Sequence, residues 1–91
     1  MQMRCKQVLE YFLKFGFVAT MRDYPYKKGQ KILVNRKYKA EVIDVFEVNK
    51  DSLDLFVDFS SFSNVKSWIN KAKELHGKMP RYIVVVRRVN K

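Results

Sequence analysis

The sequence predicts an α+β fold, a small open mixed β-barrel of about five strands with two α-helices. The first observation is the order of the periodic segments, which runs helix, several strands, helix, strand. The second is that the strand segments follow one another with short turns, which disfavours a parallel doubly wound sheet. The third is length, because 91 residues form a single domain (1–91) with no room for separate cofactor and substrate domains.

Two segments have the spacing of amphipathic helices. Apolar residues over 5–13 fall on one side of a helix, and Gly16 follows as its stop. A second apolar stripe runs over 65–75, and Ser63 is expected to cap this helix. Trp68 belongs to that stripe, so we interpret it as a core residue.

The strand candidates are bounded by turn residues. They are the segments 17–21, 31–34, 38–48 and 81–89. Residues 23–29 read as a loop because they contain Pro25 and Gly29, and 35–37 read as a turn. The stretch 51–60 stays ambiguous: its alternation fits a strand, but the same residues could form a short helical turn.

The charge is large and unevenly distributed. Nineteen Lys and Arg stand against nine Asp and Glu, for a net charge of +10. Residues 1–40 carry +8, residues 41–58 carry −5 and residues 59–91 carry +7. Such an excess usually has a polyanionic partner, most often nucleic acid, and the asymmetry predicts one electropositive face and one acidic edge.

The densest basic cluster covers both hairpin loops and is interleaved with tyrosines. Mobile cations suit backbone phosphates, and flat rings can stack on unpaired bases. We expect a nucleic-acid site in a groove between the first helix–strand junction and these loops. Its residues are Arg22, Tyr24, Tyr26, Lys27, Lys28, Lys31, Arg36 and Lys37. A second cluster could join it on one face, formed by Arg81, Arg87, Arg88 and Lys91.

Several short sequence segments, taken in their order along the chain, resemble the ASCH group of the PUA-like superfamily. They are 28–34 (KGQKILV), 40–45 (AEVIDV), 61–68 (SFSNVKSW) and the closing strand 82–87. Together they touch about two thirds of the chain. The resemblance implies an open, PUA-like β-barrel and an association with RNA.

The chain departs from the best-known signature of that group at the first helix–strand junction. Counted from Gly16, Val18 stands where a lysine belongs and Met21 where an acidic residue belongs, and Arg22 comes one position early. Some members of the group are hydrolases that depend on these polar residues. We therefore carry over the fold and the RNA association but expect no catalytic residues.

Other chemistry-bearing residues favour ordinary roles. His76, the single histidine, is expected at the end of the second helix, where the helix dipole favours an imidazolium. Cys5 is the single cysteine, so it can form neither an internal disulfide nor a metal cluster, and we expect a buried, reduced thiol. Strand parity places Glu41 and Glu47 on one face and Asp44 on the other, which weakens a carboxylate site. We expect no metal and no cofactor.

These observations favour a cytoplasmic RNA-binding domain that is not an enzyme. One alternative is a hydrolase of RNA or of a modified nucleoside; another is an interaction module that docks an acidic protein. No membrane association is expected, because the longest aliphatic run (83–86) is four residues. We expect a monomer, or a weak homodimer that pairs through an exposed edge at 82–89.

Overall fold

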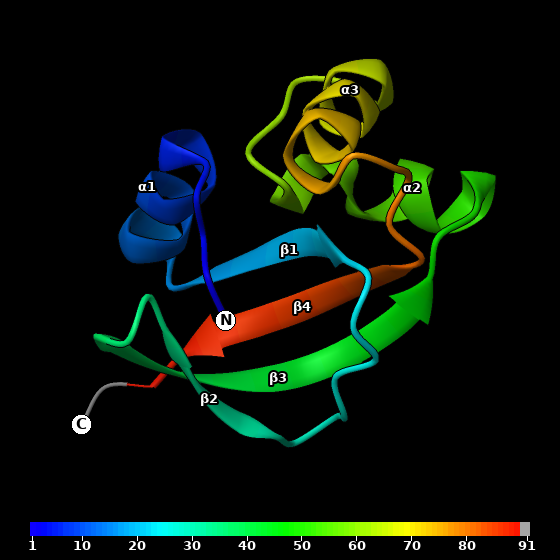
Figure 1. Cartoon of the computed structure of the whole chain (residues 1–91). Helices are drawn as coiled ribbons and strands as arrows, with labels where there is room; N and C mark the ends of the chain where they lie inside the picture. Colours follow the sequence, from blue (N-terminus) through cyan, green and yellow to red (C-terminus); the bar gives the residue numbers. More distant parts are fainter. Residues whose placement is uncertain (90–91) are drawn as a thin grey trace.

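The computed structural model describes residues 1–89, so the predicted contribution of Lys91 lies outside the described residues. The elements, in chain order, are α1 (Lys6–Phe15), β1 (Phe17–Arg22), β2 (Lys31–Val34), β3 (Tyr38–Glu47), α2 (Lys50–Phe56), the 3-10 helix η1 (Val57–Phe59), α3 (Val65–His76) and β4 (Tyr82–Arg88). The α+β class is confirmed (Figure 1). Gly16 ends α1 in the left-handed conformation, as the sequence predicted, and Gly77 ends α3 in the same way. The expected cap of α3 at Ser63 is wrong: the next residue, Asn64, caps the helix, because its side chain accepts a hydrogen bond from the Ser67 N–H at 2.8 Å.

The sheet has four strands in the order β1-β4-β3-β2, and every neighbouring pair is antiparallel. The expected count of about five strands and the mixed pairing are therefore wrong. Within residues 1–89, β1 and β2 stand at opposite edges and do not pair with each other, so the sheet is open. β4 lies between β1 and β3, so the expected exposed edge at 82–89 is also wrong: both edges of this strand are paired inside the chain.

The ambiguous stretch 51–60 is helical, which gives three α-helices rather than two. The cause is a capping box at its start. The Asn49 side chain accepts a hydrogen bond from the Ser52 backbone N–H at 2.9 Å, and the Ser52 hydroxyl accepts one from the Asn49 N–H at 3.0 Å. This reciprocal pair satisfies two amide donors that a helix start otherwise leaves without partners.

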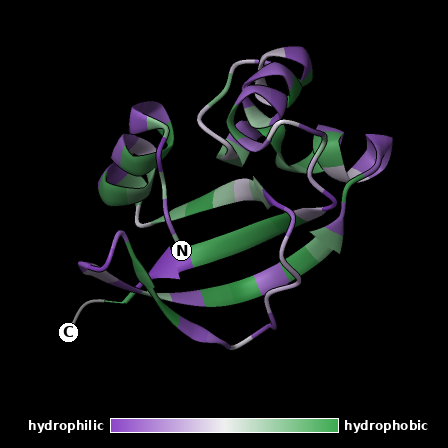
Figure 2. Ribbon diagram, in the orientation of Figure 1, coloured by the Kyte–Doolittle hydropathy of each residue, from purple (hydrophilic) through white to green (hydrophobic). Residues whose placement is uncertain are grey.

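Each face of the sheet is buried by different elements (Figures 1 and 2). The α1 face, covered by α1 and residues 1–5, contains Val18, Val34, Val42, Val84 and Val86. The α3 face, covered by α2 and α3, contains Ala19, Met21, Ile83 and Val85. Figure 2 shows β4 as hydrophobic along most of its length, as expected for a strand buried on both sides.

A bulge in β3 changes the expected parity of its carboxylates. The register shifts between Val42 and Asp44, so Ile43 is an extra residue in β3. Glu41 and Asp44 consequently lie opposite β4 residues of the α3 face, whereas Glu47 lies opposite a residue of the α1 face. The prediction that Glu41 and Glu47 share a face is wrong because parity counting assumes an unbroken ladder.

Within the described residues, no helix is both long enough and apolar enough to cross a membrane.

Candidate functional site

The turn between β2 and β3 presents two cations. Asn35 and Arg36 both have positive φ, 53° and 58°, and the Lys37 N–H donates to the Val34 carbonyl at 3.0 Å. Two successive positive φ values give the hairpin turn whose twist matches the strands, a turn that usually holds Asn-Gly. Arg36 stands where glycine is preferred. The side chains of Arg36 and Lys37 are exposed at this tip.

Two cations contact the ring of Tyr38, which follows the tip of the β2–β3 turn. The Lys37 Nζ lies 5.3 Å from the centre of its ring, and the Arg88 Cζ also lies 5.3 Å from it. Each is a cation–π contact. Both cations therefore contact the same ring, which places two positive charges around Tyr38 beside the tip of the turn.

The loop before β2 is tied to β3 through its backbone. The Gly29 N–H donates to the Val42 carbonyl at 2.6 Å, and the Val42 N–H donates to the Gln30 carbonyl at 2.9 Å. Gly29 has a φ of 86°, which other residues rarely adopt. These bonds fix the loop that carries Lys27 and Lys28, both exposed.

The two tyrosines of this loop differ in accessibility. Their rings meet edge to face with centroids 4.8 Å apart. Tyr24 is 61% exposed, whereas Tyr26 is half-buried against the α1-face core. Only Tyr24 of the pair therefore offers much ring surface to a base.

The strand beside the turn adds a mixed surface on the α3 face, beyond the part that α2 and α3 cover. Lys31 lies opposite Glu41, and Glu41 lies opposite Arg87. Glu41 and Arg87 form an ion pair at 3.1 Å, and Lys31 remains exposed beside it. Leu33, 50% exposed, lies on the same face.

The second basic cluster is partly neutralised. Asp23 pairs with Arg81 at 3.2 Å and with Lys78 at 3.1 Å. The hydrogen bond from Lys78 is the main reason that the pKa of Asp23 is lowered. With Arg87 paired to Glu41, only Arg88 of the predicted cluster lacks a carboxylate partner among residues 1–89.

The structure divides the predicted site into two parts. Lys31 lies level with Phe17 across the sheet, whereas Arg22 lies level with Glu47, near α2. Five strand steps separate Phe17 from Arg22, about 17 Å. Lys31 and the turn therefore lie toward one end of the sheet, and Arg22 lies at the other. Lys27 and Lys28 lie on the loop at the start of β2, which is bonded to Val42 in the middle of β3, so the five exposed cations follow the β2 edge of the sheet.

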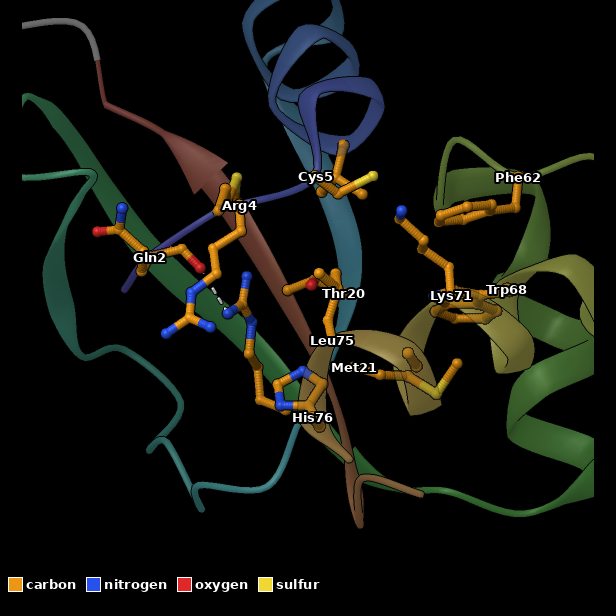
Figure 3. A pocket seen from close by; sticks show the side chains of 14 residues that line it. Gln2, Arg4, Cys5, Thr20, Met21, Phe62, Trp68, Lys71, Leu75 and His76 are labelled. Carbon is orange, nitrogen blue, oxygen red and sulfur yellow. Dashed lines mark hydrogen bonds between the residues drawn. The ribbon is translucent and has the colours of Figure 1, made fainter. Parts of the chain in front are cut away.

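Arg22 lines a pocket between the N-terminal segment, β1 and α3. The cavity measures about 310 Å³. It lies at the Arg22 end of β1, not at the Gly16 end where the groove was expected. Its walls are Gln2, Met3, Arg4, Cys5, Val8, Thr20, Met21, Arg22, Phe62, Trp68, Lys71, Ala72, Leu75 and His76. Figure 3 shows Gln2, Arg4 and His76 on one side of this space and Phe62 and Trp68 on the other.

The guanidinium of Arg22 is only partly satisfied. Its Nη1 donates to the Gln2 carbonyl at 2.6 Å, while its buried Nε makes no hydrogen bond with any part of residues 1–89. Burial lowers the pKa of Arg22; Tyr26 opposes this shift, and the charge of Arg4 adds to it. A guanidinium remains protonated throughout, so the pocket holds a positive charge with an unused donor.

His76 is the last residue of α3 and faces this pocket. The helix dipole was expected to favour its protonated form. Instead its pKa is lowered, first because it is partly buried and second because Arg22 lies near; the Met21 backbone and Asp23 act in the opposite direction. Loss of solvent and the two neighbouring cations, Arg22 and Arg4, thus disfavour the imidazolium at this site.

Sequence reasoning missed two cations of the pocket. Arg4 precedes α1 and Lys71 lies in α3, and no spacing pattern relates them to Arg22. Lys71 also pairs with Glu74, three residues on in the same helix, at 3.5 Å. Trp68 is buried with the α3-face core, as predicted, and it also forms part of the pocket wall. Cys5 is half-buried in that wall rather than fully buried.

The carboxylates do not assemble. No group of three or more His, Cys, Asp or Glu side chains in residues 1–89 is placed to hold a metal ion. Asp44 instead accepts a hydrogen bond from the Val45 N–H at 3.0 Å.

Comparison with known proteins identifies a viral relative. No protein-family model matches the chain, and no solved structure matches it. A relative is the "Uncharacterized protein 105" of Sulfolobus islandicus rod-shaped virus 1, which is 36% identical over 80 residues. The match covers 80% of this chain and 76% of the viral protein.

Proposed function

The chain belongs to the family of that viral protein 105, and we propose that it binds RNA along the basic β2 edge of its sheet. The proposed contacts are the exposed cations of the turn and loop, with Tyr24 as a stacking ring. Kinship with the ASCH group is part of the proposal. It is supported by the helix–strand order and by the sequence phrases that carry the resemblance.

One observation carries the proposal: the cations along the β2 edge of the sheet lack carboxylate partners. Within residues 1–89, no ion pair engages Lys27, Lys28, Lys31, Arg36 or Lys37. All five side chains are exposed. Cations held apart from carboxylates repel one another and lower stability, so their concentration on one surface is best explained by a polyanion that binds there.

The neighbouring surface suits unpaired bases rather than a duplex alone. Leu33 is 50% exposed and Tyr24 is 61% exposed, so apolar and aromatic surface lies beside the cations. RNA-binding surfaces combine these two components, because phosphates need positive charge and splayed bases need flat partners. The unit that binds is proposed to be a monomer or a weak homodimer.

The test compares two variants of equal net charge. The first replaces Lys27, Lys28, Arg36 and Lys37 by Gln, which lowers the net charge from +10 to +6. The control replaces four exposed lysines elsewhere, Lys6, Lys50, Lys66 and Lys73, and also gives +6. Fluorescence anisotropy then measures binding to single-stranded RNA, hairpin RNA and duplex DNA over a range of salt concentrations.

We expect the first variant alone to lose most of its RNA affinity. If all four side chains contact phosphates of a single strand, the slope of log K against log salt falls by about 3. Equal losses in both variants would show that net charge alone drives binding, and would contradict the proposed site. A preference for RNA over duplex DNA in the natural protein at about 150 mM salt would support contacts beyond phosphate.

A further inference from the structure

The pocket at Arg22 is separate from the proposed RNA surface. Of the eight residues that the sequence predicted, Arg22 is the one that lines it. The cations of the turn and loop lie elsewhere. Whatever the pocket binds is therefore recognised by a second set of groups.

The charge in this wall points to an anion. Arg4, Arg22, Lys71 and His76 line the cavity, and among residues 1–89 no carboxylate lines it, Glu74 pairing with Lys71 from outside the lining. Asp23, the acid near His76, is engaged by Lys78 and Arg81. A concave wall with charge of one sign concentrates ions of the opposite sign. The buried Arg22 Nε has no hydrogen-bond partner, and an oxygen of a bound anion could accept its hydrogen bond.

The other wall points to a flat, apolar ring. Phe62 and Trp68 lie across from Arg4 and His76 (Figure 3). Ala72 and Leu75 of α3 add further apolar surface to the lining. Pockets for small molecules start at about 300 Å³. At about 310 Å³ this one has room for one nucleotide unit but not for a longer chain.

We infer that this pocket binds a nucleoside monophosphate, either free or as the terminal nucleotide of an RNA. The phosphate lies against Arg4 and Arg22, and the base lies against Phe62 and Trp68. Lys71 borders the space between the two walls, where it can reach the ribose or phosphate. The inference does not depend on the proposed RNA surface, since none of the exposed lysines contributes to it.

Trp68 supplies a direct readout because it is the single tryptophan and borders the cavity. Its emission is followed during titration with adenosine and cytidine 5′-monophosphates, with the parent nucleosides and with inorganic phosphate. We expect saturable changes with the monophosphates and at least about tenfold weaker binding of the nucleosides, which lack the charged group. Binding of nucleosides as tight as that of monophosphates would overturn the assignment.

Variants locate the binding. Arg4→Gln and Lys71→Gln are each expected to weaken monophosphate binding by about tenfold, and Arg22→Gln by more. Lys73→Gln is the matched control for Lys71, because Lys73 is exposed on the same helix and does not line the cavity. Arg4 is exposed, so its variant keeps the fold even if the Arg22 variant does not. Unchanged affinity in both Arg4→Gln and Lys71→Gln would overturn the inference.

Alkylation of Cys5 gives a second readout of the same space. Cys5 is the single cysteine and lines the pocket, so a bound monophosphate should slow its reaction with iodoacetamide. No protection at saturating monophosphate would contradict binding there.

Comparing 5′-phosphorylated with 5′-hydroxyl RNA in the same assay distinguishes an RNA end from a free nucleotide. The variant that replaces Lys27, Lys28, Arg36 and Lys37 should keep monophosphate binding, so this inference and the proposed RNA surface can fail separately.

Discussion

At the scale of single residues, Arg36 occupies a backbone conformation that favours glycine. Its φ of 58° costs a residue with a side chain about 1–2 kcal/mol relative to the right-handed region. A charged residue kept at a strained position suggests that its side chain is used there.

We therefore predict opposite effects on stability and binding for Arg36→Gly. The free energy of unfolding, measured by urea denaturation, should rise by about 1 kcal/mol because the strain is relieved. RNA affinity should fall, because a phosphate contact is lost. Arg36→Ala is the control: it should lose the same affinity without gaining stability. Full RNA affinity in both variants would remove Arg36 from the proposed site.

His76 predicts a pH dependence of stability. Its folded-state pKa lies below the unfolded value of about 6.5, so the unfolded chain binds the proton more readily. The stabilisation is complete above pH 6.5 and declines as the pH falls through that value toward the lowered pKa. Thermal unfolding between pH 7.5 and 5 should show this decline, and His76→Gln should reduce it. An identical decline in the variant would assign it to other groups.

At the scale of elements, α2 shows how a short cap decides between two structures. The apolar pattern of 51–60 fits a strand as well as a helix, but the Asn49–Ser52 capping box starts a helix. The bulge at Ile43 also has a large local effect. One extra residue in β3 places Asp44 on the same face as Glu41 and moves Glu47 to the opposite face.

Asn49→Ala should lower the free energy of unfolding by about 1 kcal/mol, because the Ser52 backbone N–H at the start of α2 loses its partner. Urea denaturation followed by circular dichroism measures the loss. Asn49→Ser, which retains a capping oxygen, should recover most of it. If Ala were as stable as Asn, the cap would not be what holds α2 helical.

At the scale of the whole molecule, the cations of the turn and the carboxylates of α2 lie at opposite ends of β3. β3 runs from the basic turn to the acidic start of α2, a span of about 30 Å over its ten residues. At about 0.15 M salt the screening length is about 8 Å, so exposed charges at one end hardly affect a ligand at the other.

We predict that Asp51→Asn combined with Asp54→Asn changes RNA affinity less than about twofold, although the net charge rises from +10 to +12. Anisotropy at physiological salt measures it. A large gain in affinity would place the RNA near α2 and contradict the proposed surface.

The sequence by itself determined the class of fold, most of the elements and the excess of positive charge. These properties are local, since apolar periodicity, a glycine after a helix and a count of lysines depend on neighbouring residues alone. Only the tertiary structure decided that β4 is central, that Arg22 is separate from the other predicted cations, and that Arg4, Lys71 and His76 join it around a pocket. The physical reason is that strand order, register and helix placement depend on contacts between residues far apart in the chain, which no local pattern encodes.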